Sequence, residues 1–131
     1  GITTALEFSR VLFRSFGTSI AIPRDGSRAY VIVSGALHVI DTATLEVLGS
    51  IDVGASPSRV VISPDGTRAF VTSSFGAGSL MFSGQVVVID TATNVVLNSI
   101  LLPSLVPDSI AITPDGLRAY EIGRASCRDR V

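Results

Sequence analysis

Two sequence motifs alternate along this chain and constrain its fold more than any other feature. The first reads IAIPRDGSRAYV at 20–31 and recurs as VVISPDGTRAFV at 60–71 and as IAITPDGLRAY at 110–120. The second reads VIDTATLEVLGSI at 39–51 and recurs as VIDTATNVVLNSI at 88–100. Copies of the first motif start 40 and then 50 residues apart, so the basic period is 40 residues and the second copy is longer. A period of this length indicates a repeat protein built from stacked units.

Each period predicts four short strands. In the first repeat we expect them at 20–22, 28–34, 36–41 and 46–51. An Asp-Gly pair favours a tight turn after the first strand, and Asp-Thr-Ala-Thr favours another between the third and the fourth. Connections this short make neighbouring strands antiparallel. Because no window shows a sustained helical period, the predicted fold class is all-β.

The predicted strands are apolar on both faces. Ala29, Val31 and Val33 belong to one face of the second strand. Tyr30 and Ile32 belong to the other. Charged residues make up only 16% of the chain, below the roughly 25% of a typical soluble protein. A small sheet covered on both faces and repeated at this spacing is typical of β-propeller blades. The sequence therefore predicts a partial β-propeller of about two and a half four-stranded antiparallel blades.

The repeats divide the chain into consecutive segments. We expect a non-native or disordered leader at 1–15, a first propeller repeat at 16–54, a second at 55–103 with an insertion at 75–84, the start of a third at 104–120 and a non-native tail at 121–131. The insertion is placed in the second repeat because Asp65 and Asp90 are 25 residues apart, whereas Asp25 and Asp41 are 16 apart.

The two ends of the chain depart from the repeat. EIGRASCRDRV at 121–131 follows Tyr120 abruptly and resembles the translation of a short-read sequencing adapter, as does LFRS at 12–15. A native but divergent repeat boundary is the alternative at both ends. Together with the incomplete third repeat, these ends predict that the chain is a fragment of a larger propeller.

Charge and composition limit the classes of partner. A net charge of −1 without a basic block predicts no nucleic-acid partner. The longest apolar stretch, Val95–Val106, is interrupted by polar residues and proline, so no transmembrane segment is expected. Cys127 is the single cysteine, so we expect no internal disulfide and no cysteine-based metal site, and we predict no cofactor.

The aspartates that recur with the repeat are interpreted as turn formers. They are Asp25, Asp65 and Asp115 beside the glycines, and Asp41 and Asp90 at the end of the third strand. An arginine follows three residues after each aspartate of the first group. This spacing predicts a repeated surface ion pair or a contact that caps the backbone.

The other conspicuous side chains are also expected to be structural. Tyr30, Phe70 and Tyr120 share one repeat position among aliphatic neighbours, which predicts packing of one blade against the next. They do not indicate a nucleic-acid stacking platform, because the basic surface that accompanies one is missing. His38, the single histidine, occupies the position of Val87 and is interpreted as a partly exposed strand residue. No catalytic, cofactor-binding or metal-binding residue is predicted.

The insertion at 75–84 is the best candidate for a binding site. It holds Phe75, Leu80, Met81 and Phe82 where the first repeat has only a tight turn. Loops carry recognition more often than the strands that support them. An adaptable apolar loop suits contact with a partner protein or a surface polymer. The alternative is that these side chains pack against an adjacent blade or a neighbouring loop.

Four segments closely resemble the YVTN β-propeller repeat family. They are PRDGSRAYV at 23–31, PDGTRAFV at 64–71, VIDTATN at 88–94 and PDGLRAY at 114–120. The resemblance covers about residues 16–120 and implies a seven-bladed propeller, usually exported to the periplasm or the cell surface. The chain departs from the family at the insertion and at Glu121, where the repeat would continue with valine.

The resemblance and the residues together predict a binding or scaffolding module. We expect a fragment of a non-enzymatic propeller of the cell envelope, or of a secreted one, whose partners include the missing blades of the same parent chain. The family also has lactonase-like relatives. The alternative is therefore a fragment of a lactonase-like or other enzymatic propeller whose active site lies mostly outside this chain. The expected localisation, which is extracellular, cell-surface or periplasmic, follows from the resemblance alone.

Overall fold

β-Strands make up all the regular secondary structure in the computed structural model, which describes residues 17–75, 83–103 and 105–125. The strands are β1 (Gly17–Ala21), β2 (Arg28–Val33), β3 (Ala36–Asp41), β4 (Val47–Ile51), β5 (Ser56–Ile62), β6 (Arg68–Phe75), β7 (Ser83–Asp90), β8 (Val95–Leu102), β9 (Leu105–Ile112) and β10 (Ala119–Ala125). The prediction of an all-β fold is confirmed. No helix in these ranges is long and apolar enough to cross a membrane.

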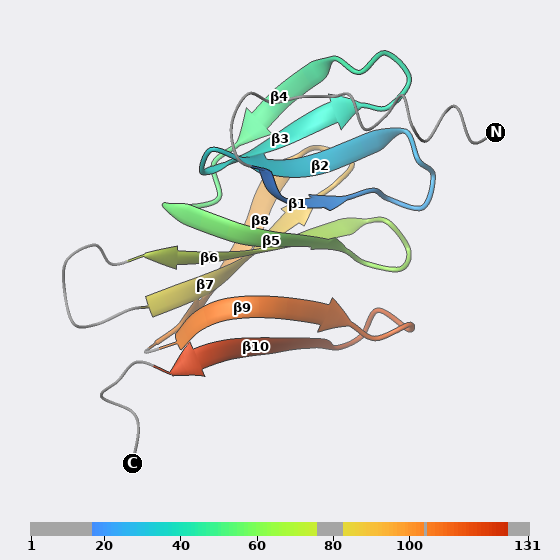
Figure 1. Ribbon diagram of the computed structural model, residues 1–131. Coiled ribbons are helices and arrows are strands. Elements are labelled where there is room, and N and C mark those ends of the chain that lie inside the picture. Colours follow the sequence, from blue (N-terminus) through green and yellow to red (C-terminus); the bar gives the residue numbers. More distant parts are fainter. Residues whose placement is uncertain (1–16, 76–82, 104, 126–131) are drawn as a thin grey trace.

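The strands form three antiparallel sheets that stack along the chain (Figure 1). Sheet 1 has the order β1-β2-β3-β4 and sheet 2 has the order β5-β6-β7-β8, so consecutive strands pair in both. Sheet 3 pairs β9 with β10. The first strand of each sheet contacts the first strand of the next, β1 against β5 and β5 against β9. These are the four-stranded antiparallel units predicted from the repeat, followed by a two-stranded one.

Strand register repeats between sheets 1 and 2. Arg28 of β2 is opposite Asp41 of β3, and Arg68 of β6 is opposite Asp90 of β7. Side chains alternate between the two faces of a strand, so equal register places equivalent residues on equivalent faces. Equivalent residues of the two repeats therefore lie in equivalent environments wherever a neighbouring sheet covers both of them.

A buried apolar cluster fills the space between sheets 1 and 2. Its members are Tyr30, Ile32, Leu37, Val39 and Ile51 from sheet 1, Val53 from the connection, and Val60, Ala69, Val71, Val87 and Ile89 from sheet 2. Burial of apolar surface contributes roughly 25 cal/mol per Å². Because each sheet buries one apolar face against its neighbour, the stability of this fold comes largely from the contacts between sheets.

The predicted Asp-Gly turns are confirmed at all three copies. Gly26, Gly66 and Gly116 have φ values of 71°, 76° and 74°. Glycine adopts this left-handed region without the steric penalty that a Cβ brings. The turns between the third and fourth strands also contain a left-handed residue, Leu45 in sheet 1 (φ 63°) and Asn94 in sheet 2 (φ 58°). Asparagine tolerates this conformation better than leucine does.

Strand β10 continues beyond the predicted end of the third repeat and ends at Ala125. Glu121 stands in this extension at the position that Val71 has in sheet 2, and its Oε1 is buried without a hydrogen-bond partner. The non-native origin of residues 121–131 stays a prediction, because pairing of β10 with β9 uses backbone groups that nearly every residue supplies.

Replacing this glutamate by the residue of the repeat is expected to stabilise the chain. Glu121→Val should raise the free energy of unfolding by about 1–3 kcal/mol, because a buried polar atom without a partner is removed. Urea unfolding followed by far-UV circular dichroism measures the change. Glu46→Val, in an exposed turn, is the control and should change the value by less than about 0.5 kcal/mol. Equal effects of the two substitutions would contradict the prediction.

Candidate functional site

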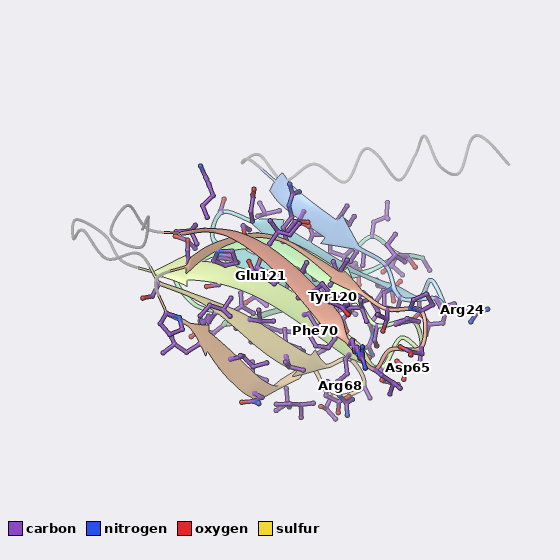
Figure 2. All side chains as sticks on the ribbon, turned by 90° about the horizontal axis from the view of Figure 1, so that it is seen from below. Arg24, Asp65, Arg68, Phe70, Tyr120 and Glu121 are labelled. Atoms are coloured by element: carbon purple, nitrogen blue, oxygen red, sulfur yellow. The ribbon has the colours of Figure 1, made fainter. Side chains whose placement is uncertain are left out.

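The polar turns of all three sheets gather at one end of the strands, which we call the turn end of the stack. Figure 2 shows Arg24, Asp65 and Arg68 there. Asp25, Asp65 and Asp115 each accept a hydrogen bond from the backbone N–H two residues further on, at 3.0–3.1 Å. The hydroxyl of Ser63 also donates to Asp65, at 2.7 Å. The interpretation of these aspartates as turn formers is confirmed.

A second turn lies beside each Asp-Gly turn in sheets 1 and 2. Asp41 accepts hydrogen bonds from the backbone N–H groups two and three residues further on, at 2.8 and 3.0 Å. The hydroxyl of Thr91 donates to the carbonyl of Gly66 at 2.6 Å, and that of Thr42 donates to the carbonyl of Gly26. These threonines tie the two turns of each sheet together, so this end is held by local hydrogen bonds.

The repeated arginines do not pair with the aspartate three residues before them. Arg68 Nη1 lies 3.4 Å from Asp90 Oδ1 on the neighbouring strand and 3.1 Å from the carbonyl oxygen of Thr67. Arg28 Nη1 donates to the carbonyl of Thr91 in sheet 2, at 3.3 Å. Arg68 therefore forms an ion pair, but with a different aspartate from the one that the spacing indicated. Arg28 and Arg68 both contact a backbone carbonyl, which was the predicted alternative. The Arg68 side chain is 43% exposed, so the ion pair contributes at most about 1 kcal/mol.

Stability is expected to fall in acid because of these turns. The hydroxyl of Ser63 and then the N–H of Thr67 lower the pKa of Asp65 from 3.8 to about 2. A carboxyl group with a lowered pKa in the folded state stabilises the fold above its unfolded pKa and loses that effect as the pH falls toward its folded pKa. The urea midpoint should therefore drop between about pH 4 and pH 2. Asp65→Asn should flatten this dependence, and an unchanged profile would contradict the assignment.

A cleft of about 290 Å³ opens between sheets 1 and 2 at the same end. Its lining residues are Pro23, Asp25, Ser27, Arg28 and Tyr30 from sheet 1, and Gly66, Thr91 and Ala92 from sheet 2. The sequence did not predict this cleft, because its two walls are far apart in the chain and meet only through stacking. It contains one carboxylate and one guanidinium, so it carries no strong excess of either charge.

The aromatic repeat position lies on the face that each sheet presents to the next. Tyr30 is fully buried, and its hydroxyl lies 2.9 Å from Asn94 Oδ1 and 3.3 Å from the carbonyl oxygen of Thr91, both in sheet 2. This burial raises the pKa of Tyr30. Phe70 is half-buried and Tyr120 is 60% exposed (Figure 2). The predicted packing of one unit against the next is confirmed at Tyr30, whereas Tyr120 remains open.

The insertion connects β6 to β7 at the opposite end of the stack. Pairing between these strands continues as far as Phe75 and Ser83, two residue pairs beyond the position at which the β2–β3 pairing ends. Of the predicted partner-binding residues, Phe75 is the last residue of β6. Leu80, Met81 and Phe82 lie outside the described residues, so their role stays a prediction.

Buried polar side chains lie at the base of this longer hairpin. Thr72 and Ser73 are fully buried, at positions where sheet 1 has Ile32 and Val33. The hydroxyl of Thr72 lies 3.0 Å from that of Ser58, whereas Ser73 Oγ is buried without a partner. These residues were not predicted from the sequence, although polar side chains at two otherwise apolar repeat positions were the signal that could have found them.

Gln85 joins the hairpin base to its surroundings. Its Oε1 accepts a hydrogen bond from Ser99 Oγ at 2.8 Å, and its Nε2 donates to the carbonyl of Val53 at 3.4 Å. Gly54, the residue after Val53, has a φ of 102°. A Cβ at this glycine would lie only 2.5 Å from Gln85 Nε2 and 2.7 Å from Ser73 Oγ. The connection between sheets 1 and 2 therefore passes this cluster so closely that a side chain at Gly54 would require Gln85 and Ser73 to move.

His38 occupies the strand position that the sequence indicated. It lies in β3 opposite Val31, is half-buried, and has Val87 as its counterpart in sheet 2. Within residues 17–75, 83–103 and 105–125 there is no group of three or more His, Cys, Asp or Glu side chains that could hold a metal ion.

Comparison with known proteins supports the fold. No family model and no curated protein matches the chain. Among solved structures, the β-propeller domain of Cps50 (Swd1) from Myceliophteria thermophila is similar, with a TM-score of 0.56 and 16% identity over 83% of this chain and 37% of that one. Hydrazine synthase of Kuenenia stuttgartiensis aligns with a TM-score of 0.42 and 20% identity over 76% of this chain and 41% of that one.

The propeller likeness and the stacked four-stranded sheets agree with each other. Together they show that the chain has part of a β-propeller fold, with sheets 1 and 2 as blades. The chain spans about two fifths of the length of each of these two structures.

Proposed function

We propose that this chain is part of a YVTN-type β-propeller that acts as a non-enzymatic binding or scaffolding module, either in the cell envelope or in a secreted protein. The family part of the proposal is supported by the PDGTRAFV and VIDTATN motifs at 64–71 and 88–94. The cellular location follows from that resemblance. The partner is a protein or a surface polymer that contacts the end of the stack at which the insertion lies.

The length of the β6–β7 hairpin is the observation that carries this proposal. Its strands remain paired for two residue pairs beyond the equivalent hairpin of sheet 1, which turns through Ser34 and Gly35. The hairpin therefore extends past its neighbour at this end of the stack. Residues at such a position contact a partner before the flat face of the sheet does.

The base of the hairpin is held in place by polar contacts with sheet residues. Gln85 is anchored at both ends of its side-chain amide, to Ser99 and to the carbonyl of Val53. The Thr72 and Ser58 hydroxyls form a second link across the β5–β6 pair. A binding loop on a rigid base loses less conformational entropy on association than one on a loose base.

Shortening the hairpin tests the proposed binding site. In the variant, residues 74–84 are replaced by the Ser-Gly turn of sheet 1, which preserves the strand register. Far-UV circular dichroism checks that the fold is retained. Biolayer interferometry then compares both chains on immobilised peptidoglycan and on an envelope protein extract. We expect the original chain to bind and the shortened chain to bind at least tenfold more weakly, about 1.4 kcal/mol.

A matched control separates the insertion from the rest of the surface. Arg24→Ala alters the turn at the opposite end and should leave binding unchanged. Equal binding by the original and shortened chains would contradict the proposed site. The non-enzymatic part is tested on the longer parent protein, which should not hydrolyse γ- or δ-lactones with or without added divalent metal. Turnover of either lactone would overturn that part of the proposal.

A further inference from the structure

Tyr30 and the turn between β7 and β8 form a contact that links one sheet to the next. The ring is completely buried, and its hydroxyl donates to Asn94 Oδ1 at 2.9 Å or to the carbonyl of Thr91 at 3.3 Å. Both acceptors belong to the Thr-Ala-Thr-Asn turn at 91–94. We call this contact, made by the tyrosine of one blade and this turn of the next, the tyrosine–turn contact.

The placement of one sheet on the next recurs along the stack. A Cβ on Gly66 of sheet 2 would lie 3.9 Å from the backbone N of Arg24 in sheet 1, and a Cβ on Gly116 of sheet 3 would lie 3.8 Å from Cδ of Pro64, which has the position of Arg24 in sheet 2. Each Asp-Gly turn therefore rests against the same position of the preceding one at nearly the same separation. A further blade placed on sheet 3 in the same way would bring the turn between its third and fourth strands against Tyr120.

Sheet 3 presents the donor half of this contact to solvent. Tyr120 is 60% exposed, although it is equivalent to the fully buried Tyr30. Leu117 is 82% exposed and occupies the position of Ser27, which lines the cleft against sheet 2. An exposed tyrosine at a position that is fully buried in sheet 1 and half-buried in sheet 2, next to an exposed leucine, indicates an interaction surface.

We propose that the surface formed by Tyr120 of β10 and Leu117 of the β9–β10 turn docks a β-blade whose turn between its third and fourth strands reads Thr-x-Thr-Asn. The Tyr120 hydroxyl donates to the asparagine side chain of that turn or to the carbonyl of its first threonine. The asparagine has two roles, because it adopts the left-handed conformation of the turn and also accepts the hydrogen bond. The sequence of this turn thereby determines which blades can dock on sheet 3.

A second copy of this chain does not fit this description. Its turn at 91–94 is already occupied by its own Tyr30. The corresponding turn of sheet 1 ends in Leu45 instead of asparagine, so it lacks the side-chain acceptor that the proposed turn supplies. This proposal concerns the turn end of sheet 3, opposite the insertion, and depends only on the fold. It therefore does not rest on the proposed binding function.

The first test measures the tyrosine–turn contact in the full chain. A double-mutant cycle compares Tyr30→Phe, Asn94→Leu and the double variant by urea unfolding. Because the hydroxyl and the amide are partners, the coupling between the two substitutions should be roughly fivefold in the unfolding equilibrium constant. Additive effects would show that the hydroxyl does not use the turn, and would overturn the proposal even if no extended chain can be made.

The second test supplies the missing blade. Residues 121–131 are replaced by copies of residues 71–103 and then 55–103, which complete the third blade and add a fourth. The chain has two tyrosines and no tryptophan, and the added segments contain neither, so fluorescence reports only on Tyr30 and Tyr120. In the original chain acrylamide should quench Tyr120 alone. In the extended chain we expect neither tyrosine to be quenched, and persistent quenching of Tyr120 would contradict the docking.

The controls use the two added turns. Leucine in place of asparagine in the fourth-blade turn should couple to Tyr120→Phe roughly fivefold in the unfolding equilibrium constant. The third-blade turn faces Phe70, which lacks a hydroxyl. Leucine in place of asparagine in that turn should therefore not couple to Tyr120→Phe. If Tyr120 of the original chain becomes protected as its concentration rises, the partner is a second copy of this chain and the proposal is wrong.

Discussion

Replacing Tyr30 by alanine is expected to lower the free energy of unfolding by about 3–5 kcal/mol, the range for removal of a large buried aromatic side chain. The ring is 0% exposed and lies in the cluster between sheets 1 and 2, so its removal leaves a cavity at the main interface. Asn94 Oδ1 also loses its hydrogen-bond donor. Urea unfolding followed by far-UV circular dichroism measures the change.

The chain contains its own matched control for this substitution. Tyr120 has the same residue type at the same repeat position, but it is 60% exposed. Tyr120→Ala should therefore cost less than about 1 kcal/mol. If both substitutions destabilised the chain equally, the loss at Tyr30 would come from the strand propensity of tyrosine. The proposed role of packing between sheets 1 and 2 would then be wrong.

Replacing Gly54 by alanine is expected to be the second most damaging change. The backbone at this position has a φ of 102°, which an L-residue rarely adopts. The new Cβ would also lie within 2.7 Å of both Ser73 Oγ and Gln85 Nε2. Backbone strain of about 1–2 kcal/mol and a steric conflict of about 1–3 kcal/mol act together, so we expect a total loss of about 2–5 kcal/mol.

Two other glycines separate these contributions. Gly26 has a φ of 71° with open space around its would-be Cβ, so Gly26→Ala should show the backbone strain alone. Gly49 has open space and no positive φ, so Gly49→Ala should have little effect or be slightly stabilising. The expected order of destabilisation is Gly54, then Gly26, then Gly49. Equal losses at Gly54 and Gly26 would show that Ser73 and Gln85 move aside without cost.

Local structure was predictable because its causes lie within a few residues. The Asp-Gly turn at 25–26 closes through hydrogen bonds from Ser27 to Asp25, two residues apart. Strand boundaries were predicted to within a few residues, and the observed β1 starts at Gly17, before the expected Ile20. Turn chemistry and alternation of side chains act over such short distances that a single sequence contains them.

Contacts between side chains of different strands were not predictable in the same way. Equivalent arginines have different partners, since Arg68 pairs with Asp90 and Arg28 reaches the carbonyl of Thr91. The buried hydroxyl of Ser73 also depends on the close passage of Gly54, 19 residues earlier in the chain. These contacts depend on where the next sheet lies, which the repeat implies only in outline.

The sequence by itself determined that this chain is an all-β repeat with tight Asp-Gly turns, because the repeat occurs in the residue letters and each turn is stabilised locally. Only the tertiary structure decided what each copy of a repeated residue does. Tyr30 and Tyr120 are the same residue in the same motif, yet one is fully buried and the other is largely exposed. The physical reason is that burial belongs to the interface between two sheets, and each copy has a different neighbour.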